Sequence, residues 1–182
     1  CGGTDITLEK SQDFLAPITL VSPKNNIDLE QTIKIDWDPV PNALAYILTA
    51  FGGSENETVF WTSSNDPDVM VDFAYKVILP AQVKQYVEKG ILLPPDKTDC
   101  RIPAGIFKDC GSPMLNVVAV GTDKIQTKDG IQTQVTVRST ATAILGMPGG
   151  MEMDDAGEPD EPVAEETTKQ QQKDEPKTSE QA

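Results

Sequence analysis

The sequence contains no histidine, the residue type that most often serves as a general base. Nucleophile systems that pair serine or cysteine with histidine are therefore excluded. Asp36 and Asp38 are two carboxylates that could carry acid–base chemistry, but outward charges at this spacing also mark a solvated strand face. No glycine fingerprint for phosphates or dinucleotides is present. We therefore expect a protein that is not an enzyme and that binds no cofactor.

Hard oxygen ligands gather at residues 65–68, whose sequence is Asn-Asp-Pro-Asp. Such ligands suit Ca²⁺, but the segment lacks the spacing and the closing glutamate of an EF-hand loop. Turn formation accounts for the same residue types. We therefore predict a turn at this position and no metal site.

Phe60 and Trp61 are adjacent in the β-prone segment 58–62. If both rings were exposed, they would form a platform for a sugar or a protein. Adjacent residues of a strand point to opposite faces, so the alternative is that one ring enters the core while the other is half covered. These two residues are the candidate ligand platform.

The first five residues, Cys1-Gly2-Gly3-Thr4-Asp5, resemble the start of a mature bacterial lipoprotein. In that class the signal peptide is cut directly before a cysteine whose sulfur carries a diacylglycerol. The resemblance implies lipidation of Cys1, a membrane as partner, and a location in the bacterial cell envelope. Gly2 favours the outer membrane or the cell surface over the inner membrane. The alternative is that the sequence merely happens to start at this cysteine, which then carries no lipid.

Cys100 and Cys110 are left as an even pair if Cys1 carries a lipid. A disulfide between them would close a loop of about 11 residues and contribute roughly 2.5–3 kcal/mol in the chain-entropy model. Such bonds persist in oxidising compartments, which agrees with export. The separation is too long for a redox Cys-x-x-Cys pair. We predict a structural disulfide, with two free thiols as the alternative.

The elements that must position these residues begin at Pro17, where short segments of period two alternate with turn residues. Between residues 32 and 38, the apolar side chains of Ile33, Ile35 and Trp37 alternate with polar ones, so this strand has one buried face. Further strands are expected at residues 18–21, 45–51, 58–62 and 69–73.

One segment breaks the β pattern. Pro80 at its first position and Gly90 just past its end are typical of helix termini. Val83, Tyr86 and Val87 recur at helical spacing between them. We predict a helix of about ten residues that packs across an open end of the β structure.

The last structured part reads as a long hairpin. Residues 115–126 and 131–145 are β-prone and flank Asp129-Gly130, a strong hairpin signal. Alternation in the second arm places Val135, Val137, Ser139, Ala141 and Ala143 on a buried face. The strand count is then about seven.

Residues 17–23, 35–43 and 45–48 resemble the opening of a fibronectin type III domain. In that family a tryptophan of the second strand is followed by a proline-containing turn and by a tyrosine of the third strand that packs near it. Trp37 and Tyr46 match this spacing. The closing hairpin fits by pattern alone, and the helix and cysteine loop depart from the family. The resemblance implies a mainly β fold, an immunoglobulin-like antiparallel β-sandwich of about seven strands with one short inserted helix.

Composition divides the chain into three expected parts: a lipid-anchored flexible tether (1–16), the sandwich domain (17–147) and a disordered acidic tail (148–182). Residues 151–182 hold 11 Asp and Glu against 3 Lys, which accounts for −8 of the net charge of −14. Such a segment lacks the apolar residues that would offset its ordering entropy. The remaining −6, without a basic cluster, argues against nucleic-acid binding. No run approaches the roughly 18 apolar residues that a membrane-spanning helix needs.

These observations predict a non-enzymatic, lipid-anchored envelope protein that acts as a protein-binding or structural module. One alternative is a carbohydrate-binding surface lipoprotein that uses Phe60 and Trp61. Another is an accessory subunit of an envelope machine or surface appendage. The fold class does not separate these three, because sandwiches host all of them.

Overall fold

The computed structural model describes residues 14–23, 27–66, 77–128 and 130–146. All of them belong to a single compact unit, residues 1–150. Cys1, most of the predicted tether, the predicted strand at 69–73 and the tail 148–182 lie outside the described residues.

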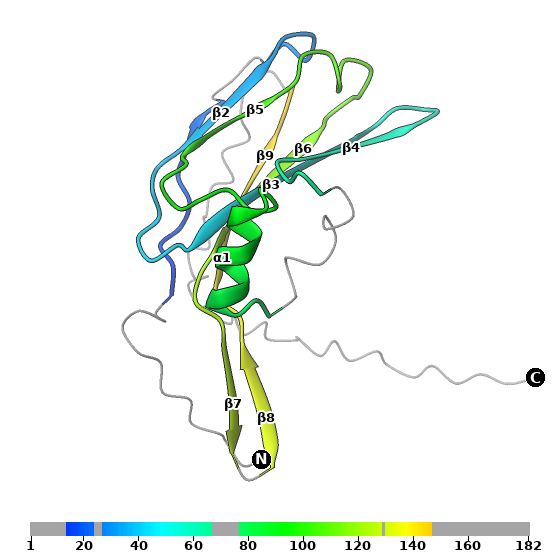
Figure 1. Cartoon of the computed structure of the whole chain (residues 1–182). Coiled ribbons are helices and arrows are strands. Elements are labelled where there is room, and N and C mark those ends of the chain that lie inside the picture. The colour runs from blue at the N-terminus through cyan, green and yellow to red at the C-terminus, as the bar shows by residue number, and fades with distance from the viewer. Residues whose placement is uncertain (1–13, 24–26, 67–76, 129, 147–182) are drawn as a thin grey trace, which may run out of the picture. The chain divides into compact units, whose positions relative to one another are not determined.

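Two antiparallel sheets face each other across a shared core (Figure 1). The first sheet has the order β1-β2-β5, formed by β1 (Leu20–Ser22), β2 (Ile33–Trp37) and β5 (Asp99–Ile102). The second has the order β4-β3-β6-β9, formed by β4 (Thr58–Thr62), β3 (Ala45–Gly53), β6 (Met114–Val120) and β9 (Arg138–Ile144). The predicted antiparallel sandwich of about seven strands is confirmed, with seven strands in its two sheets within the described ranges.

The predicted pattern of β2 is present in full: Ile33, Ile35 and Trp37 are buried, while Lys34 is exposed and Asp36 is half-buried. Alternation sends the three apolar side chains into the core because that face of the sheet is turned away from water. Strand β5 lies inside the predicted cysteine loop. Its residues pair with β2 and complete the first sheet.

The packing that the fibronectin type III resemblance implied between Trp37 and Tyr46 is confirmed. Their ring centroids lie 5.3 Å apart at an interplanar angle of 61°, an edge-to-face arrangement that aromatic pairs prefer. The Tyr46 hydroxyl oxygen accepts a hydrogen bond of 2.8 Å from the buried backbone N–H of Val40. Tyr46 therefore fixes both the core and the turn that leads into β3.

The predicted helix is confirmed as α1 (Pro80–Glu88). Its first turn is closed by Gln82, whose Oε1 accepts a hydrogen bond of 3.0 Å from the backbone N–H of Leu79. The chain leaves the helix through Gly90, whose φ of +69° lies in the left-handed region. A glycine takes that conformation without steric cost.

The predicted position of the helix, across an open end of the sandwich, differs from the observed one. The helix covers part of the outer face of the four-stranded sheet. Val83 of α1 is buried against Ile47 and Val120 in a second apolar cluster. Ile47 points outward because its neighbours Tyr46 and Leu48 enter the main core. Both faces of β3 are thus buried near its start, one by the sandwich and one by α1.

The predicted long hairpin is present, but it is divided into two parts. One part is the pairing of β6 with β9 inside the sandwich, in which Val120 faces Arg138. The other part is a two-stranded hairpin of β7 (Lys124–Lys128) and β8 (Ile131–Val135), which projects downward in Figure 1 and which we call the arm.

An irregularity separates the arm from the sandwich. Between the two regular pairings, three residues on one strand (121–123) stand against two on the other (136–137), which is a β-bulge. A Cβ on Gly121 would lie 2.8 Å from Cγ1 of Val137, so the close approach of the strands at this point requires glycine.

Candidate interaction surface

Four apolar side chains form one cross-strand row on the outer face of the four-stranded sheet. Strand register places Phe51 of β3 opposite Phe60 of β4 on one side and opposite Met114 of β6 on the other, and it places Met114 opposite Ile144 of β9. The residues next to them, such as Ala50, enter the core. Because strand side chains alternate, the four residues share the outer face. We call them the apolar row.

The apolar row is open to solvent in the described part of the chain. The side chains of Phe60, Phe51 and Ile144 are 62%, 39% and 47% exposed, and Met114 is half-buried. The two phenylalanine rings are stacked, with centroids 6.3 Å apart at an interplanar angle of 29°. Removal of such surface from water is favourable by about 25 cal/mol per Å². A partner that covered the row would gain this energy.

Polar groups border the apolar row on the side that leads to α1. The next cross-strand row consists of Thr62, Thr49, Asn116 and Thr142. Within it, the Thr142 hydroxyl donates a hydrogen bond of 2.8 Å to Oδ1 of Asn116. The row after that contains Ile47 and Val118, which belong to the cluster under α1. The sheet face therefore changes from buried apolar to polar to exposed apolar with distance from the helix.

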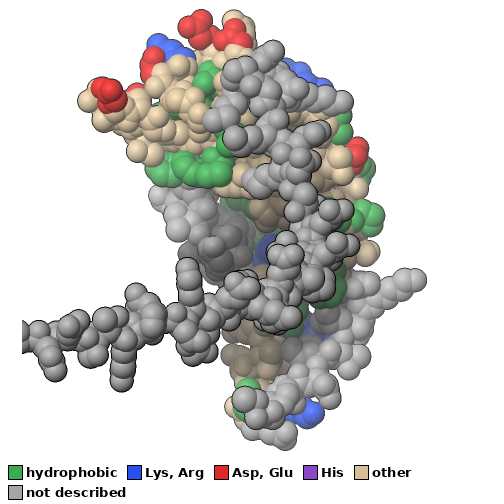
Figure 2. All heavy atoms as spheres, turned by 180° about the vertical axis from the view of Figure 1, so that it is seen from behind, with side chains coloured by type: hydrophobic (Ala, Val, Ile, Leu, Met, Phe, Trp, Pro, Cys, Tyr) green, Lys and Arg blue, Asp and Glu red, His purple; other side chains and the backbone are tan. Residues whose placement is uncertain are grey.

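The opposite border of the apolar row is the turn between β3 and β4, which carries acidic side chains. The backbone N–H of Ser54 donates to the carbonyl of Glu57 at 2.9 Å, and the Ser54 hydroxyl accepts from the N–H of Glu57 at 3.3 Å. Glu55 and Glu57 are exposed. Seen from behind, this side of the molecule combines surface hydrophobic side chains with acidic ones (Figure 2). A partner is expected to avoid negative charge here.

Of the two residues predicted as a ligand platform, the structure places only Phe60 on an exposed face. Trp61 is partly buried and packs against the main core, because it follows Phe60 on the strand and points to the opposite side. The second ring of the exposed pair is Phe51. Sequence reasoning missed Phe51, although counting back from the turn at residues 54–57 would have placed it opposite Phe60.

The predicted disulfide is not formed in the structure, in which Cys100 and Cys110 are both free thiols. Cys100 lies on β5 and pairs with Ile35 in the three-stranded sheet. Cys110 packs against Gly52 of the four-stranded sheet. A Cβ added to Gly52 would lie 2.9 Å from the Cβ of Cys110. Cys100 therefore belongs to the three-stranded sheet, whereas Cys110 packs against the four-stranded sheet. Burial raises the pKa of both thiols, which disfavours the reactive thiolate.

The other residues considered for chemistry have ordinary structural partners. Asp36 forms an ion pair with Lys34 at 2.8 Å. In the segment considered for Ca²⁺, the N–H of Asp66 donates to the Ser64 hydroxyl at 3.0 Å, while residues 67 and 68 lie outside the described residues. No group of three or more His, Cys, Asp or Glu residues in the described ranges is arranged to hold a metal ion.

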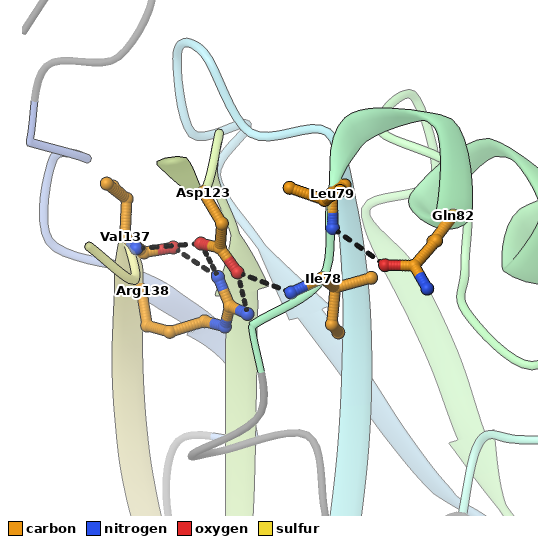
Figure 3. Close-up of polar contacts among 6 residues, drawn as sticks. All are labelled: Ile78, Leu79, Gln82, Asp123, Val137 and Arg138. Atoms are coloured by element: carbon orange, nitrogen blue, oxygen red, sulfur yellow. Dashed lines mark hydrogen bonds and ion pairs between the residues drawn. The ribbon is translucent and has the colours of Figure 1, made fainter. Parts of the chain in front are cut away.

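A buried carboxylate joins the arm to the sandwich (Figure 3). Asp123 has a fully buried side chain and makes a bidentate contact with Arg138, at 2.6 Å for Oδ1 and 2.8 Å for Oδ2. It also accepts hydrogen bonds from the backbone N–H groups of Val137 (2.9 Å) and Ile78 (2.8 Å). We call this arrangement the Asp123 clamp. It ties together the bulge, the start of β9 and the segment before α1.

The Asp123 clamp is a structural site. Both oxygens of the carboxylate have donors, and the Arg138 side chain is 10% exposed. A buried charge of this kind is tolerated only when it is paired and fully hydrogen-bonded. Because protein donors already bond to both oxygens of the Asp123 carboxylate, this site gives no indication of a bound ligand.

No known protein-family model and no curated protein matches this sequence. Within the described residues, none of the helices has the length and apolar character needed to cross a membrane. Among the residues that the structure describes, the apolar row is a group of exposed hydrophobic side chains that the packing of the sandwich does not require.

Proposed function

We propose that this chain is a non-enzymatic protein-binding module of the bacterial cell envelope and that its partner docks on the apolar row. The observation that carries the proposal is the alignment of Phe60, Phe51, Met114 and Ile144 in one exposed row across four strands. Single exposed apolar residues are normal on protein surfaces, whereas a contiguous group marks an interaction site.

The character of the surface favours a protein as the partner. Interfaces have an apolar centre, enriched in aromatic residues and methionine, and a polar rim. The row supplies the centre, and its borders of threonine, asparagine and glutamate supply the rim. Phe51 and Phe60 supply two stacked aromatic rings, a residue type that is enriched at the centre of interfaces.

Placement in the envelope rests on two resemblances. Cys1-Gly2-Gly3 resembles a mature lipoprotein start, which would supply a membrane anchor through the Cys1 sulfur. The Trp37–Tyr46 packing supports the fibronectin type III resemblance, a fold common in adhesion and scaffolding. Mass spectrometry of the protein purified from its native cells should detect a diacylglycerol on Cys1. An unmodified Cys1 would remove the anchor from the proposal without affecting the row.

Site-specific photo-crosslinking in native cells tests the docking surface. A photoreactive residue at position 51 or 144 should give a discrete higher-mass adduct with one partner protein. The matched control is position 101, because Arg101 is exposed on β5 of the opposite sheet and should give none. Adducts of equal yield at all three positions, or at none, would refute docking on the row.

A carbohydrate ligand is the second candidate, and the exposed Phe51–Phe60 pair favours it. Aromatic faces can pack against the apolar faces of sugar rings. Absence of protein adducts, together with glycan-array binding that is lost in Phe60→Ala, would select this function. Trp61→Ala is unsuitable for that purpose, because Trp61 contributes to the core. If the chain is an accessory subunit of a larger envelope assembly, the crosslinked partner should be another subunit of that assembly.

A further inference from the structure

Strand β4 is an edge strand without the usual features that protect edges. Within the described residues it pairs with β3 alone, and its sequence Thr-Val-Phe-Trp-Thr has no charge and no proline. Its pairing with β3 is regular over five residues, without a bulge. By comparison, β1 carries a register shift and β5 carries charged side chains. Unprotected edges of this kind are templates for pairing with another strand.

The hydrogen-bond pattern shows which groups of β4 face outward. Ser54 bonds to Glu57, and the N–H of Ser63 donates to the carbonyl of Leu48 at 2.9 Å. Hydrogen-bonded and non-hydrogen-bonded pairs alternate along an antiparallel ladder. Between these two fixed points, Val59 and Trp61 must therefore direct their backbone groups toward β3. Those of the other three residues, Thr58, Phe60 and Thr62, face the edge at which no other described strand pairs with β4.

From this pattern we infer that β4 pairs with β4 of a second copy of this chain, in an antiparallel dimer whose two-fold axis passes beside Phe60. In that register Phe60 faces Phe60 of the partner subunit, Thr58 faces Thr62, and Val59 faces Trp61. All outward backbone groups find partners, since three hydrogen-bonded pairs give about six bonds. Aromatic–aromatic, Thr–Thr and aromatic–β-branched pairs are the favourable cross-strand combinations.

The two acidic turns are kept apart in this arrangement. Glu55 and Glu57 lie at one end of β4, next to Thr58. An antiparallel two-fold axis at Phe60 places the acidic turns of the two copies at opposite ends of the joined strands, so they do not repel each other closely. A parallel arrangement would bring the turns together. Symmetric, self-complementary contacts of this kind are the commonest in homo-oligomers.

This inference goes beyond the proposed function, because it concerns the edge of β4 and a second copy of the same chain. The two four-stranded sheets would join into one sheet of eight strands. The apolar row of one copy would continue, through the two Phe60 side chains, into the apolar row of the other. A partner that binds the row would then meet a surface of twice the length.

Sedimentation velocity of the full 182-residue, unacylated chain over a range of concentrations tests the inference. The wild type should show a concentration-dependent dimer. Phe60→Lys and Phe60→Glu should each weaken dimerisation by about tenfold or more, because like charges would face each other across the axis. An equimolar mixture of these two variants should recover dimer as a heterodimer. Phe60 is mostly exposed, so both variants should keep the unfolding midpoint of the wild type.

Ile144→Lys is the matched control, since Ile144 lies in the same row but on β9, the other edge of the sheet. It should leave the dissociation constant of the dimer unchanged. A monomer at all concentrations would overturn the inference. A dimer insensitive to Phe60→Lys, a dimer lost in Ile144→Lys, or a mixture that stays monomeric would do the same. None of these outcomes changes the photo-crosslinking result expected for the proposed function.

Discussion

Replacement of Asp123 by alanine is expected to lower the free energy of unfolding by about 3–5 kcal/mol. The change leaves the Arg138 guanidinium without its buried partner and leaves the backbone N–H groups of Ile78 and Val137 without an acceptor. Loss of one member of a buried ion pair is costly because the other charge stays in a site of low polarity. Urea denaturation followed by circular dichroism measures the change.

The surface ion pair between Lys97 and Asp99 provides the control for this measurement. Its separation of 2.8 Å is close to the separations in the clamp, but both side chains are largely exposed. Asp99→Ala should therefore leave the denaturation midpoint nearly unchanged. Asp123→Asn, which keeps an oxygen acceptor but loses the charge, should fall between the two. Equal effects of Asp123→Ala and Asp99→Ala would show that the clamp is not shielded from water.

Replacement of Trp37 by alanine is expected to cost about 3–5 kcal/mol of unfolding free energy. Trp37 is 2% exposed and packs edge-to-face on Tyr46, which is fully buried at the centre of the core. The cavity left by the indole would lie between the two sheets, where neither sheet can close it alone. Trp37→Phe should be milder, since within the described residues the indole Nε1–H has no acceptor and phenylalanine removes that buried donor.

Trp61→Ala is the comparison for Trp37→Ala, because it removes the same side chain from a partly buried position at the sheet edge. Its cost should be clearly smaller. Denaturation curves of the two variants under identical conditions measure the difference. A cost for Trp61→Ala equal to that for Trp37→Ala would contradict the placement of the core around Trp37 and Tyr46.

The core of the fold could be predicted from the sequence because its signals are local. In β2, strict alternation of Ile33, Ile35 and Trp37 assigns one face to the core. For α1, proline at the start and Gly90 after the end mark the termini. For the arm, the Asp-Gly pair sets the hairpin, in which Lys128 now faces Ile131. Each feature depends on residues a few positions apart.

Features that depend on distant partners could not be predicted in this way. Strand β5 was hidden in a loop rich in proline and glycine, because its pairing with β2 depends on residues more than sixty positions away. The bulge at 121–123 is visible only when both strand registers are known. Asp123 has no distinctive neighbours in the sequence, and its three donor residues, Ile78, Val137 and Arg138, come from two other segments.

Of the four residues in the apolar row, one was identified from the sequence. Phe60 was singled out for its ring, and it is indeed exposed. The structure places Trp61 against the main core, in agreement with the alternative that one of the two adjacent rings points inward. The other members of the row, Phe51, Met114 and Ile144, are neighbours across strands. Pairing of four strands in register is a tertiary property, so this row emerges only in the folded chain.

The Asp123 clamp also has a mechanical consequence. A two-stranded hairpin alone is only marginally stable, so the arm depends on its attachment at the base. One carboxylate supplies part of that attachment and also holds the chain at Ile78, two residues before α1 begins. Movement of the arm independently of α1 is therefore expected to require breaking the hydrogen bonds and the ion pair of Asp123.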